Sequence, residues 1–193
     1  MSVSYDQAWD LLHDWTSSAS LLLHAKTVEA VMVRAAHRFG RGAADEQRWA
    51  ITGLLHDADY DRWPDDHPRR VVSWLVERDE PEIAHAISAH YTRWGVAAET
   101  PLDRALLASD ELTGFIVACS LVRPEGITTL APSSVKKKLK DRSFAAKVDR
   151  EEVRLGVDAL GVSLDDHIRF IIDALAPHAG DFGLGPQPRP ADP

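Results

Sequence analysis

The sequence predicts an all-α protein. Apolar residues recur at intervals of three and four along most of the chain, which is the spacing that places them on one face of a helix. The sequence has no run of strict apolar and polar alternation rich in Val, Ile and Thr, the pattern typical of half-buried strands. Clusters of Ser, Gly and Pro separate the periodic stretches and are expected to end helices. We therefore expect a helical bundle around one core.

The first half of the chain contains five expected helices. The first has Ser4 or Asp6 as its cap and carries Trp9, Leu12 and Trp15 on one face. The others follow from the same periodicity. The expected ranges are 4–16, 21–39, 45–56, 69–77 and 81–90.

Turn-forming residues mark two boundaries in this half. Gly40 and Gly42 follow the second expected helix, where they are expected to supply the positive φ that helix ends favour. The segment 57–68 is polar and contains Pro64 and Pro68, so we expect a loop or a broken helix there. This loop comes directly after a His-Asp pair.

The second half contains four more expected helices. Thr100 is placed to cap one of them, with Pro101 at its first position, and the run Arg-Pro-Glu-Gly at 123–126 ends it. Gly161 separates the last two. The expected ranges are 101–122, 133–140, 149–160 and 163–175.

The length and the last segment define the expected domain organisation. A chain of 193 residues fits one ordinary domain, which we place at residues 1–176. From Pro177 onward, five prolines and three glycines occur in 17 residues. Because such a segment has little apolar surface to offset the entropy lost on ordering, we expect residues 177–193 to form a disordered tail.

The charge and cysteine content exclude several classes of function. Thirty acidic residues against 22 basic ones give a net charge of −8, which disfavours a dedicated nucleic-acid binder or a protein of anionic membrane surfaces. Cys119 is the only cysteine, so the chain alone can form neither a disulfide nor a cysteine-based metal site. These features favour a protein of the reducing cytoplasm.

Neither a membrane span nor a secretory signal is predicted. The longest uncharged stretches, such as 112–122, have 11 residues, whereas a spanning helix needs about 20. The first residues include Asp6, Asp10 and Asp14 and have no basic region ahead of an apolar one. We expect a protein that is neither exported nor inserted in a membrane.

Four polar residues on the expected helices form the first candidate site. They are His24, the adjacent pair His56 and Asp57, and Asp110 in an otherwise apolar stretch. A carboxylate on an apolar helix face must be paired or reach solvent, because an unpaired buried charge is very costly. Two imidazoles and two carboxylates suit a divalent transition metal, namely Mn, Co, Ni, Fe or Zn.

Two further histidines could extend this site. His67 lies in the loop after the His-Asp pair, and His90 ends a later expected helix, with His85 as an alternative to His90. If Asp57 bridged the two groups, the six residues could hold two ions, an arrangement that clamps the attacking and leaving oxygens in phosphoryl transfer. We expect one ion, with a second as the alternative.

The order His24, His56-Asp57, Asp110 on an all-α chain resembles the HD superfamily of metal-dependent phosphohydrolases. The resemblance covers residues 21–122. Its core is the string Gly-Leu-Leu-His-Asp at 53–57, in which apolar residues lead into the doublet. The segments 108–114 and 135–140 are similar to a small subgroup of predicted hydrolases in that superfamily.

This resemblance implies a metal bound by His24, His56, Asp57 and Asp110, and hydrolysis of a small phosphoester, with a nucleotide as the first candidate. The histidines at 67 and 90 are similar to the extra ligands of dinuclear branches and of di-iron oxygenases with the same fold. An oxygenase is therefore one alternative function. The other is a non-catalytic ligand-binding module in which the metal only holds helices together.

Several other polar residues are candidates for handling protons or substrate. Asp57 and the loop residues Asp59 and Asp61 could orient water or protonate a leaving group. Glu111 is expected either to support a ligand or to face solvent. Five of the six lysines lie between residues 136 and 147, and they could position a phosphate or simply form a solvated face. The candidates for binding a phosphate are Lys136, Lys137 and Lys140. The tryptophans are expected in the core except for Trp63 and Trp94, which lie in or beside loops near the candidate ligands.

Overall fold

The computed structural model describes residues 3–186, and over this range it contains helices and loops but no strand. The predicted all-α class is confirmed, and each expected helix is found within a few residues of its expected bounds. Short 3₁₀ turns occur at Gly42–Ala44, Thr92–Trp94 and Ala176–His178. The α-helices are α1 (Tyr5–Trp15), α2 (Ala19–Phe39), α3 (Glu46–Leu55), α4 (Arg69–Val76), α5 (Pro81–His90), α6 (Pro101–Leu121), α7 (Pro132–Leu139), α8 (Arg150–Leu160) and α9 (Leu164–Leu175).

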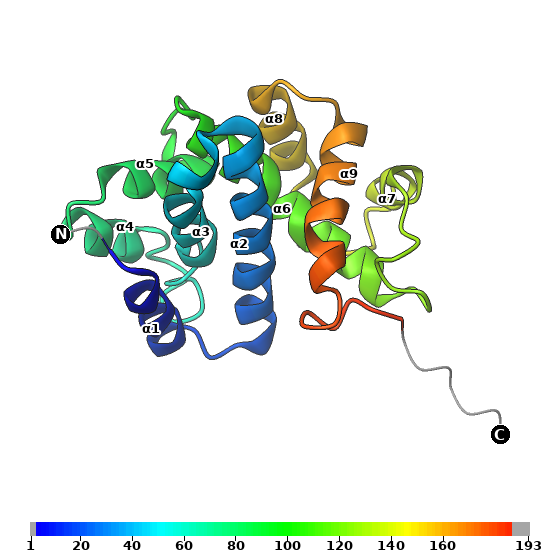
Figure 1. Cartoon of the computed structure of the whole chain (residues 1–193), viewed down its shortest axis with the longest axis horizontal. Coiled ribbons are helices and arrows are strands. Elements are labelled where there is room, and N and C mark those ends of the chain that lie inside the picture. Colours follow the sequence, from blue (N-terminus) through cyan, green and yellow to red (C-terminus); the bar gives the residue numbers. More distant parts are fainter. Residues whose placement is uncertain (1–2, 187–193) are drawn as a thin grey trace.

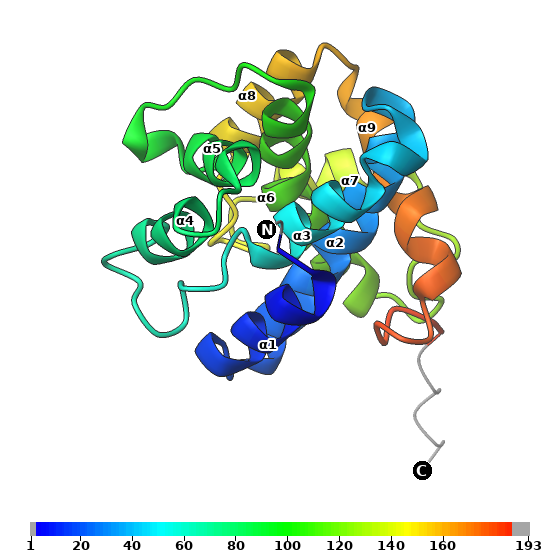
Figure 2. The same ribbon diagram turned by 60° about the vertical axis from the view of Figure 1, so that its left-hand side comes forward.

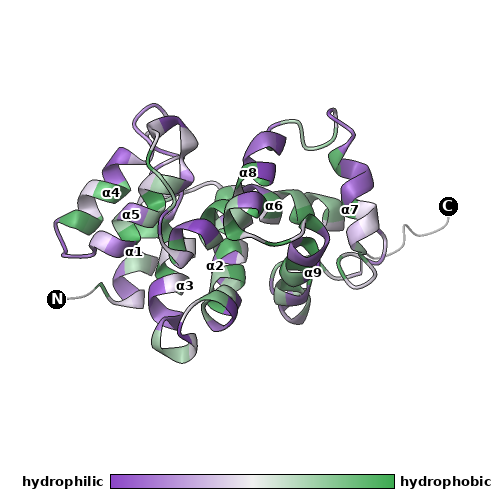
Figure 3. Cartoon of the chain, turned by 90° about the horizontal axis from the view of Figure 1, so that it is seen from above, coloured by the Kyte–Doolittle hydropathy of each residue, from purple (hydrophilic) through white to green (hydrophobic). Residues whose placement is uncertain are grey.

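The two longest helices, α2 and α6, lie at the centre of the bundle (Figure 1). Helix α2 packs against α3, α6 and α9, while α6 also packs against α5 and α8. Helices α4 and α5 lie toward one end and α7 toward the other, an arrangement also visible from above in Figure 3. A metal site on α2, α3 and α6 would therefore lie inside the bundle and not at its edge.

Side-chain caps fix where two of the helices begin. Ser4 and Gln7 form a reciprocal capping box at the start of α1, which decides between the two expected caps. Thr100 and Asp103 do the same at the start of α6, where Pro101 takes the first helical position as expected. The start of α6 sets the register in which Asp110 faces the bundle interior.

Two glycines permit close contact between helices that carry candidate ligands and the helices packed against them. A Cβ atom on Gly53 of α3 would lie 2.8 Å from Cα of Glu29 on α2. A Cβ atom on Gly156 of α8 would lie 2.4 Å from the carbonyl oxygen of Leu107 on α6. Since both obstacles are backbone atoms, any larger residue would force these helices apart. Figure 2 shows α2 and α3 side by side.

The turn after α2 differs in detail from the expectation. Gly42 has the expected positive φ of 68°, but Gly40 has φ of −103°. A Cβ atom on Gly40 would lie 2.9 Å from the Ala36 carbonyl oxygen and from Oδ2 of Asp45. Space, and not a positive φ, therefore explains the glycine at position 40.

The first part of the expected disordered tail packs against the domain. Leu184 is fully buried, and its carbonyl oxygen accepts a hydrogen bond of 2.8 Å from the backbone of Ile127. Gly126, with φ of 61°, allows the chain to approach this closely. The structure thus differs from the expectation of disorder over residues 177–186, while residues 187–193 of that prediction lie outside the described residues.

Over residues 3–186, none of the helices combines the length and the apolar character that crossing a bilayer requires.

Candidate metal centre

Four of the predicted ligands converge in the interior. Nε2 of His24 on α2 lies 3.1 Å from Nε2 of His56 at the end of α3, and 2.9 Å from Oδ1 of Asp110 on α6. Oδ2 of Asp57 lies 3.5 Å from Nε2 of His56 and 3.8 Å from that of His24. Bonds of about 2.1 Å to one ion would place neighbouring ligand atoms about 3.0–3.4 Å apart. The separations of 2.9–3.5 Å that involve His56 or Asp110 are close to this range, whereas the 3.8 Å between Asp57 and His24 is wider.

The four side chains of this cluster differ in exposure. The side chain of His56 is fully buried, whereas those of His24, Asp57 and Asp110 are 18–21% exposed. The cluster is therefore closed on the side of His56 and reaches solvent on the side of the other three ligands, which leaves room for a water molecule or a substrate on the ion. Catalytic metal sites keep such an open position, while purely structural sites are closed.

The ring of His56 is held with one nitrogen toward the cluster. Its Nδ1 donates to the carbonyl oxygen of Gly53 at 2.8 Å, so Nε2 is left as the ligand atom. The ring of His24 has Gly114 beside it, where an added Cβ atom would lie 3.6 Å from the imidazole. Backbone thus orients the ring of His56, while the absence of a side chain at Gly114 leaves space for the ring of His24.

A second group of ligand atoms shares Asp57 with the first. Nε2 of His67 lies 3.3 Å from Oδ1 of Asp57, and Nε2 of His90 lies 3.7 Å from the same oxygen. Nδ1 of His90 donates to the carbonyl oxygen of Ile87, which directs Nε2 inward. The two carboxylate oxygens of Asp57 therefore face different groups, with Oδ2 toward His24 and His56 and Oδ1 toward His67 and His90.

The alternative ligand His85 lies elsewhere. Its Nδ1 is 3.0 Å from Oδ2 of Asp103, the buried carboxylate that caps α6. In the described residues His85 belongs to neither group of ligand atoms. The structure therefore favours His90 over His85.

The charges of the cluster are strongly coupled. Burial alone would lower the pKa of His56, but the carboxylates of Asp57 and Asp110 outweigh it and raise this pKa to about 9. Burial alone would raise the pKa of Asp110, but the imidazoles of His56 and His24 hold it well below its usual range. The site stabilises two carboxylates that need positive charge beside them, and a divalent cation would supply it.

Comparison with known protein families agrees with this geometry. Residues 21–114 match the family model of the HD domain, a stretch that contains all six of these residues. The chain contains an HD domain. HD domains define a superfamily of metal-dependent phosphohydrolases, and a His and Asp cluster able to hold metal ions is typical of them. No curated protein and no solved structure matches the chain.

The six ligands in the two groups form what we call the HD cluster: His24, His56, Asp57, His67, His90 and Asp110. Asp59, two residues after the ligand Asp57, supports this cluster without joining it. It is fully buried, and its Oδ1 accepts a hydrogen bond of 2.7 Å from Nδ1 of His67. Its Oδ2 accepts from the backbone N–H groups of Arg70 at 3.0 Å and Val71 at 3.1 Å. With both oxygens occupied, Asp59 has the geometry of a residue that positions His67, whereas the sequence suggested that it could orient water or protonate a leaving group.

Asp61 ties the loop after the HD doublet to the start of α2. Its Oδ2 accepts hydrogen bonds from the backbone N–H groups of Ser17 at 2.8 Å and Ser18 at 3.0 Å, and these bonds lower the pKa of its carboxyl. It belongs to neither ligand group. These contacts favour a structural role in place of the expected role in proton transfer.

Glu111 follows the ligand Asp110 but is turned away from the ligand atoms. Its Oε2 accepts a hydrogen bond of 3.1 Å from the backbone N–H of Asp149, at the start of α8. Burial, with the neighbouring charge of Asp110, raises the pKa of Glu111 to about 8. The residue thus links α6 to the segment that leads into α8.

The candidate phosphate-binding lysines lie on α7 and just after it. Lys136 and Lys140 line a groove between α7, α8 and α9, while Lys137 lines a separate pocket. No ligand of the HD cluster lines either cavity. Among the described residues the structure therefore does not bring these lysines together with the metal ligands.

Sequence reasoning missed an aromatic surround of the second ligand group. The rings of Tyr60 and Tyr91 meet the ring of His67 edge to face, with centroids 5.3 and 5.2 Å apart. Tyr91 also contacts Trp94, and the guanidinium of Arg69 lies 5.5 Å from the Trp94 ring centre. The signal was present in the sequence, since Tyr60 follows Asp59 and Tyr91 follows His90.

The two tryptophans singled out from the sequence differ in position. Trp94 belongs to this aromatic surround, as expected of a residue near the ligands. Trp63 instead packs edge to face against Trp15, with centroids 5.1 Å apart, and Arg70 lies 4.5 Å from its ring centre. Trp63 therefore helps to fix the loop 57–68 against α1.

Proposed function

We propose that this protein is a metal-dependent phosphohydrolase that cleaves a small phosphoester, with a nucleotide as the first candidate substrate. The observation that carries the proposal is the convergence of His24, His56, Asp57 and Asp110 at ligand distances inside an HD domain. The partial exposure of His24, Asp57 and Asp110 supports a catalytic and not only a structural ion. The proposed ion is Mn, Co, Ni, Fe or Zn, because the donor set mixes imidazole with carboxylate.

When bound, such an ion would lower the pKa of a water molecule toward neutrality and polarise a phosphoryl oxygen. The protein holds the ligand atoms in place for it. Nε2 of His56 is fixed by the hydrogen bond to Gly53, and Asp59 fixes His67 in the same way. Asp57 belongs to both ligand groups and can also accept a proton from a nearby water through whichever oxygen is free of metal.

The aromatic surround supports a nucleotide as the first substrate to try. Tyr91 and Trp94 offer ring surfaces for stacking, and Arg69 places a guanidinium beside them that could pair with a phosphate. Tyr60 is 45% exposed, so this residue is also accessible to a substrate. The alternative site at Lys136, Lys137 and Lys140 is not adjacent to the ligands in any contact of the described residues.

The deciding experiment is phosphate release from a panel of nucleotides and sugar phosphates, measured with each of these metals. We expect activity with at least one metal and one substrate, and loss of about 1,000-fold or more in Asp57→Ala, which removes a ligand. The control is Asp65→Ala in the same loop, an exposed residue outside both ligand groups. Intact substrates across the panel, with metal bound, would reject the proposal.

The second group of ligand atoms also supports an alternative function, that of a di-iron oxygenase that uses all six residues. Elemental analysis of protein purified without chelators separates the two functions. Two irons per chain together with substrate-dependent oxygen consumption would support the oxygenase. One Mn, Co or Ni per chain with phosphate release supports the hydrolase. Metal-dependent melting without either reaction would support the non-catalytic module.

A further inference from the structure

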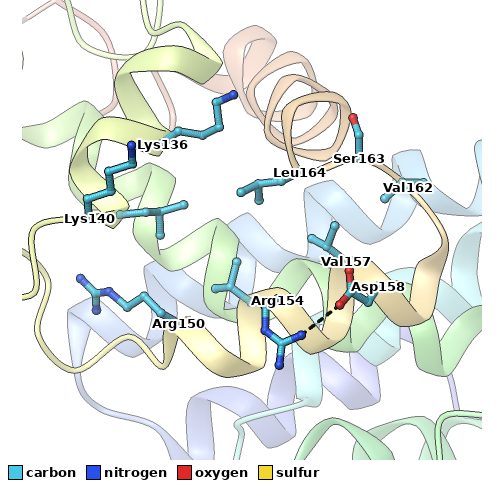
Figure 4. A pocket seen from close by; sticks show the side chains of 11 residues that line it. Lys136, Lys140, Arg150, Arg154, Val157, Asp158, Val162, Ser163 and Leu164 are labelled. Carbon is cyan, nitrogen blue, oxygen red and sulfur yellow. Dashed lines mark hydrogen bonds and ion pairs between the residues drawn. The ribbon is translucent and has the colours of Figure 1, made fainter.

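A groove of about 500 Å³ lies between α7, α8 and α9, apart from the metal centre. Figure 4 shows its three sides, with Lys136 on α7 and Lys140 just after it, Val157 on α8, and Leu164 at the start of α9. Its volume falls within the range of small-molecule sites, which is about 300–1,000 Å³. None of the ligands of the HD cluster lines it.

The walls of the groove are mostly aliphatic. Val153 and Val157 of α8 form one wall and are themselves nearly buried, while Leu139, Val162 and Leu164 are half-buried and form the others. The half-buried side chains of Leu139, Val162 and Leu164 supply the apolar surface that solvent reaches, with the two valines beneath it. Such a surface favours the chain of an apolar molecule.

The polar lining is strongly cationic. Lys136, Lys140, Arg150 and Arg154 line the groove against the single carboxylate of Asp158, in a chain whose net charge is −8. Charge of this sign over an apolar surface is complementary to a molecule with an anionic head.

Three of these four cations already have partners. Lys136 pairs with Asp165, and Arg154 pairs with Glu151 and Asp158. Arg150 donates to the carbonyl oxygens of residues 144, 145 and 148.

Lys140 is the exception. Its ammonium has no hydrogen bond, ion pair or ring contact within residues 3–186, and it extends from the end of α7 beside the groove (Figure 4). A cation that lacks a protein partner and borders an apolar groove is placed to receive the head of an amphiphile.

We propose that this groove binds a free, single-chain amphiphile with an anionic head, such as a medium-chain carboxylate. The aliphatic chain lies on Val153, Val157 and Leu164, and the carboxylate meets Lys140. The site is independent of the metal centre and of the proposed hydrolysis.

The first test is a calorimetric titration of the full-length protein with decanoate, at concentrations below those at which decanoate forms micelles. Lys140→Glu replaces an attraction with a repulsion and is expected to weaken binding about fivefold. Lys137→Glu is the matched control, since it makes the same change of charge on the same helix but outside the groove. Equal effects of the two variants would overturn the proposal, because they would indicate a nonspecific effect of surface charge.

Decanol tests the role of the head, because it has the same chain without the charge. We expect it to bind about fivefold more weakly than decanoate and to be indifferent to Lys140→Glu. Equal binding of the two probes to the unmodified protein would contradict an anionic head at Lys140.

A second pair of variants tests where the aliphatic chain of the ligand lies. Val162→Trp fills the groove and is expected to weaken both probes at least tenfold, while Ala159→Trp on the exposed face of α8 leaves them unchanged. The titrations are repeated with metal-loaded and chelator-treated protein, and equal dissociation constants are expected. Loss of decanoate binding on chelation would place the carboxylate at the metal centre and overturn the proposal.

Two other occupants of the groove give distinct results. Binding to anionic vesicles without binding of monomeric decanoate would indicate a membrane surface. A dimer in sedimentation that Val162→Trp converts to a monomer, again without decanoate binding, would indicate a second copy of this chain. Either result would replace the proposed ligand.

Discussion

Nδ1 of His67 donates a hydrogen bond of 2.7 Å to the buried carboxylate of Asp59, and this contact leaves Nε2 of His67 facing Asp57 at 3.3 Å. Asp59 is held in turn by two backbone N–H groups at the start of α4. The orientation of His67 therefore depends on the docking of α4 as well as on the ligand loop. Hydrogen bonds of this kind set both the direction and the basicity of a metal-binding imidazole.

We predict that Asp59→Asn weakens the second ligand group without removing the first. An amide cannot accept from His67 and from two N–H groups as a carboxylate does, so affinity for a second ion is expected to fall about 10–100-fold. The measurement is metal stoichiometry and affinity by calorimetry. Asp65→Asn, which makes the same change of charge at an exposed position of the loop, is the control. Unchanged binding of two ions in Asp59→Asn would show that His67 needs no such support.

A second prediction concerns the close contact between α2 and α3. Gly53→Ala places a Cβ atom 2.8 Å from Cα of Glu29, and backbone cannot move away as a side chain can. We expect a loss of about 1–3 kcal/mol in the free energy of unfolding, from overpacking. Because His56 is three residues later and His24 is on α2, we also expect weaker metal binding.

The control for this change is Gly180→Ala, since a Cβ atom on Gly180 would meet nothing within 4 Å. Chemical denaturation gives the stability of both variants, and calorimetry gives their metal affinity. A Gly53→Ala protein as stable as the unmodified one would mean that the helices separate at no cost.

The helices could be predicted from the sequence because they depend on local patterns, and the first ligand group could be predicted because the order of its His and Asp residues resembles that of the HD superfamily. The periodicity and caps define where α1 and α6 begin, and the string at 53–57 identifies the doublet. What escaped prediction depends on contacts between distant segments. The burial of Leu184 against Ile127 orders residues that composition alone describes as a tail. The partners of Asp59 become visible only when α4 folds back onto the ligand loop.

The lysines of α7 illustrate the same limit. Their clustering is plain in the sequence, but a helix presents successive residues in different directions, so Lys136 and Lys140 share a groove that Lys137 does not reach. Whether such a cluster lies beside the metal ligands depends on how α7 docks, which no local pattern specifies. The sequence shows the cluster of charge but not where the cluster lies in the fold.

A third prediction concerns acid sensitivity and the buried residue His167. Burial lowers the pKa of His167 to about 4, whereas an unfolded histidine titrates near 6.5. As the pH falls from about 6.5 to 4, the unfolded chain takes up a proton that the folded protein does not. The free energy of unfolding therefore decreases by up to about 1.4 kcal/mol for each pH unit in this window.

His167→Gln removes this titration and keeps a polar group near Ser109, whose Oγ lies 3.4 Å from Nε2 of His167. Glu111, whose pKa is raised, contributes a slope of opposite sign between pH 4.5 and 8, so the informative quantity is the difference between the two proteins. We expect the unmodified protein to lose more stability than His167→Gln between pH 7 and pH 5 in urea denaturation. Parallel pH profiles would show that His167 is protonated as readily in the folded state as in the unfolded one.

The last prediction concerns removal of the metal. Asp57 and Asp110 lie within one group of ligand atoms, and without a cation their repulsion is offset by the neighbouring imidazoles, chiefly by protonation of His56, whose pKa is about 9. An ion present at 100 times its dissociation constant would add about 2.7 kcal/mol to the free energy of unfolding. For a chain of this size that corresponds to about 5–11 °C in melting temperature. We therefore expect a chelator to lower the melting temperature by this amount, and readdition of the metal to restore it.

The control is Asp110→Ala, in which the chelator should have little effect because the ligand that α6 contributes to the first group is gone. A melting temperature that is indifferent to both chelator and metal would show that the four side chains meet without binding an ion.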